Sequence, residues 1–187
     1  MKRIVLSLLL LSLLMPLSSE NLKISSPDGL LVVNMTLHNG TPAYSVQYKD
    51  KIILEESPLG LITNISDFSR NLKLVETNEQ TIHNSYYEPK SKKSSIEYLA
   101  NEVTFTLETA QEELFSIIFR VSNNNIAFRY KLAQNGETAR CIVEKEFSGF
   151  NFPSFTTTFL TPQATPMIGW MQTKPSYEEE YVPDEPV

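Results

Sequence analysis

Two runs of alternating apolar and polar residues in Ser116–Leu132 constrain the fold of this chain more than any other feature. The segment reads SIIFRVSNNNIAFRYKL, and a period of two over each run predicts a pair of β-strands. We place a two-residue turn at Asn123-Asn124, because Asn tolerates the positive φ angles of hairpin turns. A slip of one residue would turn half of the apolar side chains toward water, so the pattern also predicts the register. The apolar pairs expected on one face are Val121 with Ile126, Phe119 with Phe128 and Ile117 with Tyr130.

Residues 1–19 have the composition of a secretory signal peptide. Lys2-Arg3 give a positive start, Ile4–Met15 form a short apolar run, and the small residues Ser18 and Ser19 suit a cleavage site. The alternative, an uncleaved membrane anchor, needs about 18 or more apolar residues. We therefore expect an exported protein whose domain covers residues 20–181, with 182–187 as a tail.

The charge balance disfavours nucleic acid as a partner. The chain has a net charge of −6, and loss of Lys2 and Arg3 with the signal peptide, which carries no acidic residue, changes this to −8. An acidic surface repels phosphate, so we expect the basic cluster Lys90, Lys92 and Lys93 to be a solvated loop. No later segment is apolar enough to span a bilayer.

Short strand-like segments separated by turn residues run along the rest of the chain. Asn39-Gly40 is the strongest hairpin signal, and Ser26–Gly29, Lys49–Lys51 and Asn135-Gly136 are further turns. Asn78–Ser95 has no clear period, and nothing after residue 19 has the pattern of an amphipathic helix. About ten short strands with turns between them predict an all-β sandwich. Besides the hairpin, the expected strands are Leu22–Ser25, Leu30–His38, Pro42–Tyr48, Ile52–Glu55, Leu72–Thr77, Ile96–Leu99, Val103–Leu107 and Arg140–Phe147.

The chain has few of the residues that metal sites and nucleophilic catalysis require. Cys141 is the only cysteine, which excludes an internal disulfide, and its apolar neighbours favour a buried side chain over a reactive thiol. The two histidines, His38 and His83, are far apart in sequence, so we expect no structural zinc site. We expect His38 to be a surface residue at the end of a strand.

The proline-rich region Asn151–Val187 holds two candidate binding features. In Tyr177–Tyr181, the consecutive acidic residues Glu178, Glu179 and Glu180 offer the carboxylate oxygens that calcium prefers. Calcium takes roughly six to eight oxygen ligands, so the run could supply only part of a site, and the alternative is a solvated acidic tail. The second feature is an aromatic side chain. Trp170, like Tyr86-Tyr87 earlier in the chain, either stacks on a sugar ring or packs against its own sheet.

Several motifs together resemble the N-terminal domain of family 97 glycoside hydrolases, from about Leu22 to Tyr181. None is specific by itself, but their order and spacing match the family, and they follow an export signal. The motifs are Ser26-Pro27-Asp28-Gly29, Tyr44-Ser45-Val46 before Lys51, Ser57-Pro58-Leu59-Gly60-Leu61, Asn101-Glu102, Phe119-Arg120-Val121, Ala127-Phe128-Arg129-Tyr130, and Tyr177-Glu178 with Tyr181.

The resemblance implies a carbohydrate-active protein. Members of the family are exported bacterial enzymes, often periplasmic, that hydrolyse α-glucosides or α-galactosides, typically with calcium. Their N-terminal domain is a β-super-sandwich similar to the galactose mutarotase fold, which agrees with the strand pattern. A (β/α)₈ barrel follows and carries the catalytic acid and the base or nucleophile, and a small β domain completes the protein.

The chain also departs from the family pattern. It ends at Val187, before any barrel strand, so the catalytic carboxylates have no counterpart and the sandwich is expected to be incomplete at its C-terminal end. By the match of Tyr177-Glu178, Glu178 is the candidate for the calcium-binding glutamate of this domain. The family's Trp-Gly-Glu segment is altered at Tyr87-Glu88-Pro89, and Asn125 stands where a glycine is usual.

Two functional hypotheses follow. The first is an N-terminal module that supports and partly lines the active site of a (β/α)₈ barrel, binds α-linked oligosaccharide with it, and has no hydrolase activity by itself. The second is a freestanding exported carbohydrate-binding sandwich. Both place the protein outside the cytoplasm, and the first leaves a free sheet edge that favours aggregation of the isolated chain.

Overall fold

The protein folds into an all-β structure in which every described element is a strand. The computed structural model describes residues 22–134, 136, 140–160 and 182–187. This part of the chain forms twelve strands and no helix, and so offers no helix that could cross a membrane.

The strands follow one another closely along the chain. They are β1 (Leu22–Ser25), β2 (Leu31–His38), β3 (Thr41–Tyr48), β4 (Lys51–Pro58), β5 (Leu61–Thr63), β6 (Lys73–Tyr87), β7 (Ser95–Glu108), β8 (Leu114–Ser122), β9 (Asn125–Leu132), β10 (Val143–Glu146), β11 (Thr157–Leu160) and β12 (Val182–Pro186).

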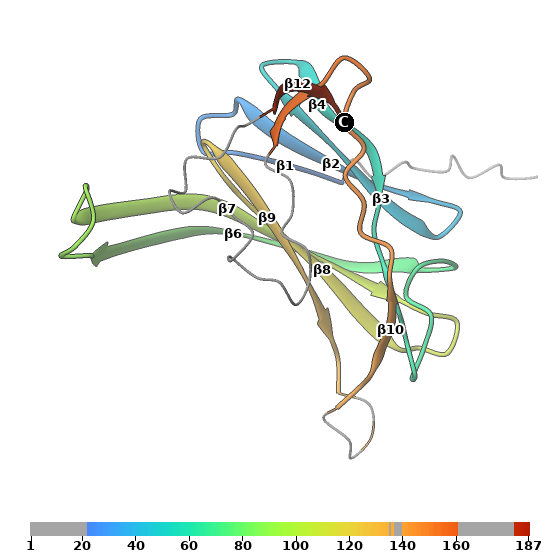
Figure 1. Ribbon diagram of the computed structural model, residues 1–187. Coiled ribbons are helices and arrows are strands. Elements are labelled where there is room, and N and C mark those ends of the chain that lie inside the picture. Colours follow the sequence, from blue (N-terminus) through green and yellow to red (C-terminus); the bar gives the residue numbers. More distant parts are fainter. Residues whose placement is uncertain (1–21, 135, 137–139, 161–181) are drawn as a thin grey trace, which may run out of the picture.

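Two four-stranded antiparallel sheets make up most of the fold (Figure 1). The first sheet has the order β1-β2-β3-β4 and the second the order β6-β7-β8-β9, so each is a meander of strands adjacent in sequence. The pairs β5–β10 and β11–β12 are separate two-stranded sheets. The all-β sandwich predicted from the strand pattern is therefore confirmed.

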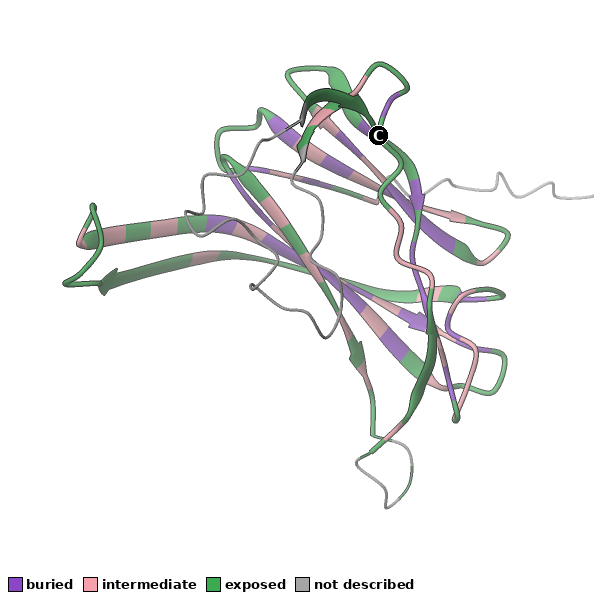
Figure 2. Ribbon diagram, in the orientation of Figure 1, coloured by how far each residue is buried: buried purple, intermediate pink, exposed green. Residues whose placement is uncertain are grey.

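The core lies between the two four-stranded sheets and is formed by their alternating inward side chains. Figure 2 shows the buried residues concentrated on β2, β3, β7 and β8. The ring of Tyr44 on β3 lies 5.5 Å from that of Phe119 on β8 and 5.6 Å from that of Phe128 on β9. These contacts join the two sheets, because each pairs a ring from the first sheet with one from the second.

The hairpin of β8 and β9 has the register predicted from the sequence. Phe119 lies opposite Phe128, and Ser122 lies opposite Asn125 at the turn. The expectation of positive φ at this turn was wrong, since the described residues with positive φ do not include Asn123, Asn124 or Asn125. Asn123 has another role, because its Oδ1 accepts a hydrogen bond from the Asp28 N–H at 3.1 Å.

The Asn39-Gly40 hairpin shows the conformation that the Asn-Asn turn lacks. Asn39 and Gly40 have φ angles of 49° and 78°, as the Asn-Gly dipeptide predicts. Gly40 is further required by close packing, because a Cβ at this position would lie 2.6 Å from the Leu72 nitrogen.

Two strands, β6 and β7, extend into residues for which the sequence predicted no strand. β6 continues through the unpatterned segment to Tyr87, and β7 is one strand where two were expected, because it continues through Ala100. Both faces of β6 are largely exposed, which removes the alternation that reveals a half-buried strand. β12 lies within the segment that the sequence predicted as a tail.

Near Cys141 the expectation of a buried apolar segment was wrong. Cys141 is partly exposed, and the side chains of Ile142 and Val143 are 67% and 52% exposed. The strand is also shorter than predicted, since β10 covers only Val143–Glu146 and pairs only with the short β5. A strand in so small a sheet has little surface against which to bury its side chains.

Residues 147–151 cover the outer edge of β4. The Glu55 N–H donates to the Asn151 carbonyl at 2.7 Å, and the Gly149 N–H donates to the Pro58 carbonyl at 3.0 Å. This segment therefore satisfies backbone groups that an exposed edge strand would leave free.

Candidate functional site

The two binding residues predicted from the sequence, Trp170 and Glu178, lie outside the described residues. The strands on either side of them are described, and Leu160 at the end of β11 pairs with Val182 at the start of β12. The two ends of the intervening segment are therefore held next to each other by this strand pair.

No cluster for a metal ion occurs in the described part of the chain. Among residues 22–134, 136, 140–160 and 182–187, no three His, Cys, Asp or Glu side chains lie together in a way that could hold a cation. The candidate calcium ligand Glu178 lies outside these ranges and remains a prediction.

An ion pair lies on the outer face of the second sheet, and we name Gln80, Glu102 and Arg120 the outer-face cluster. Glu102 on β7 lies opposite Gln80 on β6 and Arg120 on β8. Because the neighbouring Val103 and Phe119 point into the core, these side chains point away from it.

The Glu102 carboxylate uses both of its oxygens. Its Oε2 accepts from Arg120 Nε at 2.8 Å and from Arg120 Nη2, and its Oε1 accepts from Gln80 Nε2 at 2.7 Å. The Glu102 side chain is 7% exposed and that of Arg120 is 35% exposed. The cluster therefore fixes the guanidinium of Arg120 on the sheet surface.

The electrostatic balance keeps Glu102 ionised. Burial favours the neutral acid, but the hydrogen bonds from Arg120 and Gln80 and the nearby positive charges outweigh it, so the pKa of Glu102 is lowered. A carboxylate with a lowered pKa and two occupied oxygens is unsuited to act as a general acid.

Beside the cluster, the sheet surface forms a shallow depression of about 150 Å³. Its lining combines apolar side chains with two guanidinium groups and one carboxylate, so it lacks the carboxylate pair that breaks a glycosidic bond. The lining residues are Glu102, Ile118, Arg120, Ala127, Phe128 and Arg129.

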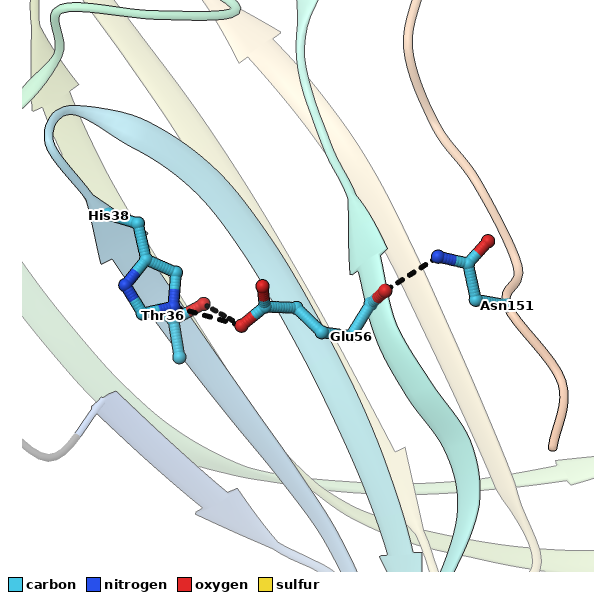
Figure 3. Close-up of polar contacts among 4 residues, drawn as sticks. All are labelled: Thr36, His38, Glu56 and Asn151. Atoms are coloured by element: carbon cyan, nitrogen blue, oxygen red, sulfur yellow. Dashed lines mark hydrogen bonds and ion pairs between the residues drawn. The ribbon is translucent and has the colours of Figure 1, made fainter.

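A second polar cluster joins β2, β4 and residue 151 on the first sheet (Figure 3). Glu56 Oε2 lies 2.9 Å from His38 Nε2 and accepts from Thr36 Oγ1 at 3.3 Å. The Glu56 carbonyl accepts from Asn151 Nδ2 at 2.6 Å. His38 is an exposed residue at the end of its strand, as predicted. With one carboxylate among four residues, this group lacks the carboxylate pair of a glycosidase.

A buried tyrosine, Tyr44, and a partly buried one, Tyr130, hold residues 147–151 against the sandwich. Tyr44 OH donates to the Gly149 carbonyl at 3.2 Å, and Tyr130 OH lies 2.7 Å from Ser148 Oγ and accepts from the Gly60 N–H at 3.0 Å. Burial, with a smaller effect of Tyr130, raises the pKa of Tyr44 to about 12, and burial also raises that of Tyr130. Both hydroxyls therefore stay protonated and position the chain that leads to β11.

Sequence reasoning did not identify the outer-face cluster or the two tyrosine hydroxyls. A signal for the cluster was present, since Arg120 falls on the outward side of the predicted hairpin and Glu102 belongs to another of the quoted motifs. The register between β7 and β8, which brings them together, was not predicted.

The fold and its surface define a β-sandwich module without a catalytic carboxylate pair in its described polar clusters. Residues 24–187 match the family described as Glycosyl-hydrolase 97 N-terminal, so the chain belongs to this family.

Relatives of the chain are longer glycosidases. This chain is 47% identical to a solved β-arabinopyranosidase, with a TM-score of 0.78. The match covers 88% of this chain and 26% of that one. The chain is 28% identical over 136 residues to a protein of Streptomyces bingchenggensis (strain BCW-1) described as "Probable retaining alpha-galactosidase", which covers 73% of this chain and 20% of that one.

A third relative supports the fold. The family 97 enzyme of Pseudoalteromonas sp. strain K8, solved in complex with panose, is 23% identical, with a TM-score of 0.69, over 75% of this chain and 22% of that one. The chain thus spans only 20% to 26% of the length of these relatives.

Proposed function

We propose that this chain is the N-terminal module of a family 97 glycosidase that supports and partly lines the active site of a (β/α)₈ barrel. By itself it does not hydrolyse glycosides. The family match over residues 24–187 carries the proposal. The described polar clusters support it, because Glu102 is held ionised by its partners and Glu56 has no second carboxylate in its cluster.

The relatives suggest the class of sugar. We propose that the complete enzyme acts on a β-arabinopyranoside or an α-galactoside, and that its module contacts an α-linked oligosaccharide through Trp170. L-Arabinopyranose and D-galactopyranose carry their ring hydroxyls in the same arrangement and differ by one hydroxymethyl group. The 47% identity to a β-arabinopyranosidase favours the smaller sugar.

Calcium is part of the proposal. Glu178 would supply one carboxylate ligand to the ion, and because calcium takes roughly six to eight oxygens, the barrel would supply most of the others. When bound, the ion would polarise a substrate oxygen as a Lewis acid. We further propose that the protein is exported to the periplasm, which cell fractionation would test.

A domain exchange tests this function. The segment of the β-arabinopyranosidase that matches this chain is replaced by residues 22–187, and hydrolysis of an aryl β-arabinopyranoside is measured beside the isolated chain. We expect activity from the chimaera and none from the chain alone. Robust turnover by the isolated chain, or an inactive but folded chimaera, would contradict the proposal.

A matched pair of variants tests the calcium ligand in the same chimaera. Glu178→Gln should raise the calcium concentration needed for activity. Glu179→Gln should not, because alternate side chains of an extended segment would point to opposite sides. Equal effects of the two substitutions on the calcium concentration needed would count against Glu178 as a calcium ligand.

A freestanding sugar-binding sandwich is the second candidate, favoured by the exposed rings of Tyr86 and Tyr87, which are 48% and 68% exposed. Titration of the isolated chain with malto-oligosaccharides, followed by Trp170 fluorescence, separates the two candidates. A saturable change in fluorescence supports the freestanding sandwich. No such change is expected if the chain is the N-terminal module of a larger enzyme.

A further inference from the structure

The strands β6 and β7 continue past the sandwich as a two-stranded arm, residues 82–99, which we name the β6–β7 arm. β7 is paired with β8 only as far as Ala100, opposite Ser122, whereas its pairing with β6 continues to Ser95, opposite Tyr87. Figure 1 shows this ribbon extending away from the other strands. A two-stranded hairpin is at best marginally stable in water without further packing.

Apolar side chains dominate one face of the arm and occur among polar residues on the other. Tyr86 lies opposite Ile96, and Tyr98 lies one pair further along on the same face. On the other face, Tyr87 and Leu99 are 68% and 44% exposed. Exposed apolar surface of this extent marks a site of interaction with another molecule or domain.

The tip of the arm carries the opposite charge to the protein as a whole. Its loop is closed by a hydrogen bond from the Glu88 N–H to the Ser94 carbonyl at 2.7 Å, and Lys90, Lys92 and Lys93 are exposed there. The net charge of the whole chain is −6. An acidic surface on the partner would therefore be attracted to the tip and not to the sandwich.

We propose that the β6–β7 arm inserts into an apolar groove, bordered by carboxylates, on the catalytic domain of the full-length enzyme. The proposal rests on the proposed function, and the relatives, of which this chain spans 20% to 26%, provide the additional chain that such a groove requires. A protein groove fits better than a sugar, because branched aliphatic side chains such as Ile82 and Ile96 accompany the aromatic rings on one face of the arm.

Cleavage by trypsin tests the arm, because Lys90, Lys92 and Lys93 are its cutting sites. The isolated chain and the chimaera described above are digested under identical conditions, and cleavage at the tip is followed by mass spectrometry. Docking should slow this cleavage at least about tenfold in the chimaera, since proteolysis tracks the population of the exposed form.

Variants of the arm identify the surface. The double variant Tyr86→Thr with Tyr98→Thr keeps residues that favour strands but removes both rings from one face, and it should restore rapid cleavage in the chimaera. Ser85→Ala, on the opposite face of the same strand, is the matched control and should leave the tip protected. Circular dichroism of the isolated variants checks that the sandwich still folds.

The outcomes separate the two proposals. An active chimaera whose tip is cut as fast as in the isolated chain overturns the docking proposal and leaves the proposed function standing. An inactive chimaera whose tip is protected overturns the proposed function and leaves the docking proposal standing. An inactive chimaera whose tip is not protected overturns both proposals. Protection of the isolated chain that grows with its own concentration would identify a second copy as the partner and overturn the docking proposal.

Discussion

Removing either member of the Glu102–Arg120 ion pair should have unequal effects on stability. Arg120→Met leaves a carboxylate that is 7% exposed with Gln80 as its remaining partner, whereas Glu102→Gln leaves a guanidinium that is 35% exposed and open to water. The unpaired buried charge is the more costly of the two, so the arginine variant should be the less stable.

The magnitudes follow from the burial of each group. Arg120→Met should lower the free energy of unfolding by about 3 kcal/mol, the low end for breaking a buried pair, because Arg120 is itself partly solvated. Glu102→Gln should cost about 1 kcal/mol. The double variant should be about as stable as Glu102→Gln alone, since no buried charge remains.

Urea unfolding followed by circular dichroism at pH 7 measures these differences, with Lys131→Met as a control that removes an exposed charge from the same face. Because the pKa of Glu102 is lowered in the folded protein, the stability from this pair is present above the usual value of 4.5 and is lost as the pH falls below it. The deficit of Arg120→Met should therefore shrink in acid. A deficit for Glu102→Gln that equals or exceeds that of Arg120→Met would refute the argument from burial.

Three further predictions concern the core and its turns. Phe119→Ala should lower the free energy of unfolding by about 3–5 kcal/mol in urea melts, because the ring is fully buried between the sheets. Gly40→Ala should lower the melting temperature more than Gly29→Ala; both glycines have positive φ, but only at Gly40 would the new Cβ meet backbone, and equal losses would contradict this. Above pH 10, stability should fall toward pH 12 as the buried Tyr44 is forced to ionise, and Tyr44→Phe should flatten that part of a melting-temperature profile.

The sequence predicted strand pairing best where two independent constraints agreed. In Ser116–Leu132, the alternation and the two-residue turn required the same pairing, and the structure has it. Asn78–Ser95 lacked such a constraint, because β6 is exposed on both faces and its side chains need not alternate. The length of β6 comes from pairing with β7, a contact between segments that periodicity within one strand does not report.

The candidate site was harder to predict for the same reason. Glu102 and Arg120 are 18 residues apart, and only the register of β7 against β8 brings them into contact. Trp170 and Glu178 were proposed from residue type and family resemblance, and they remain predictions. The partial exposure of Cys141 shows the limit of local reasoning, because apolar neighbours in sequence do not supply a covering layer in space.

The pairing of β11 with β12 bears on how the length of the chain between them could vary among homologues. Both ends of the intervening 161–181 segment are fixed by one strand pair, so insertions or deletions within it would leave the pairing of the two main sheets unchanged. Doubling the length of a flexible connection costs only about 0.6 kcal/mol of closure entropy. Changes of length in this segment would therefore leave the supporting scaffold intact.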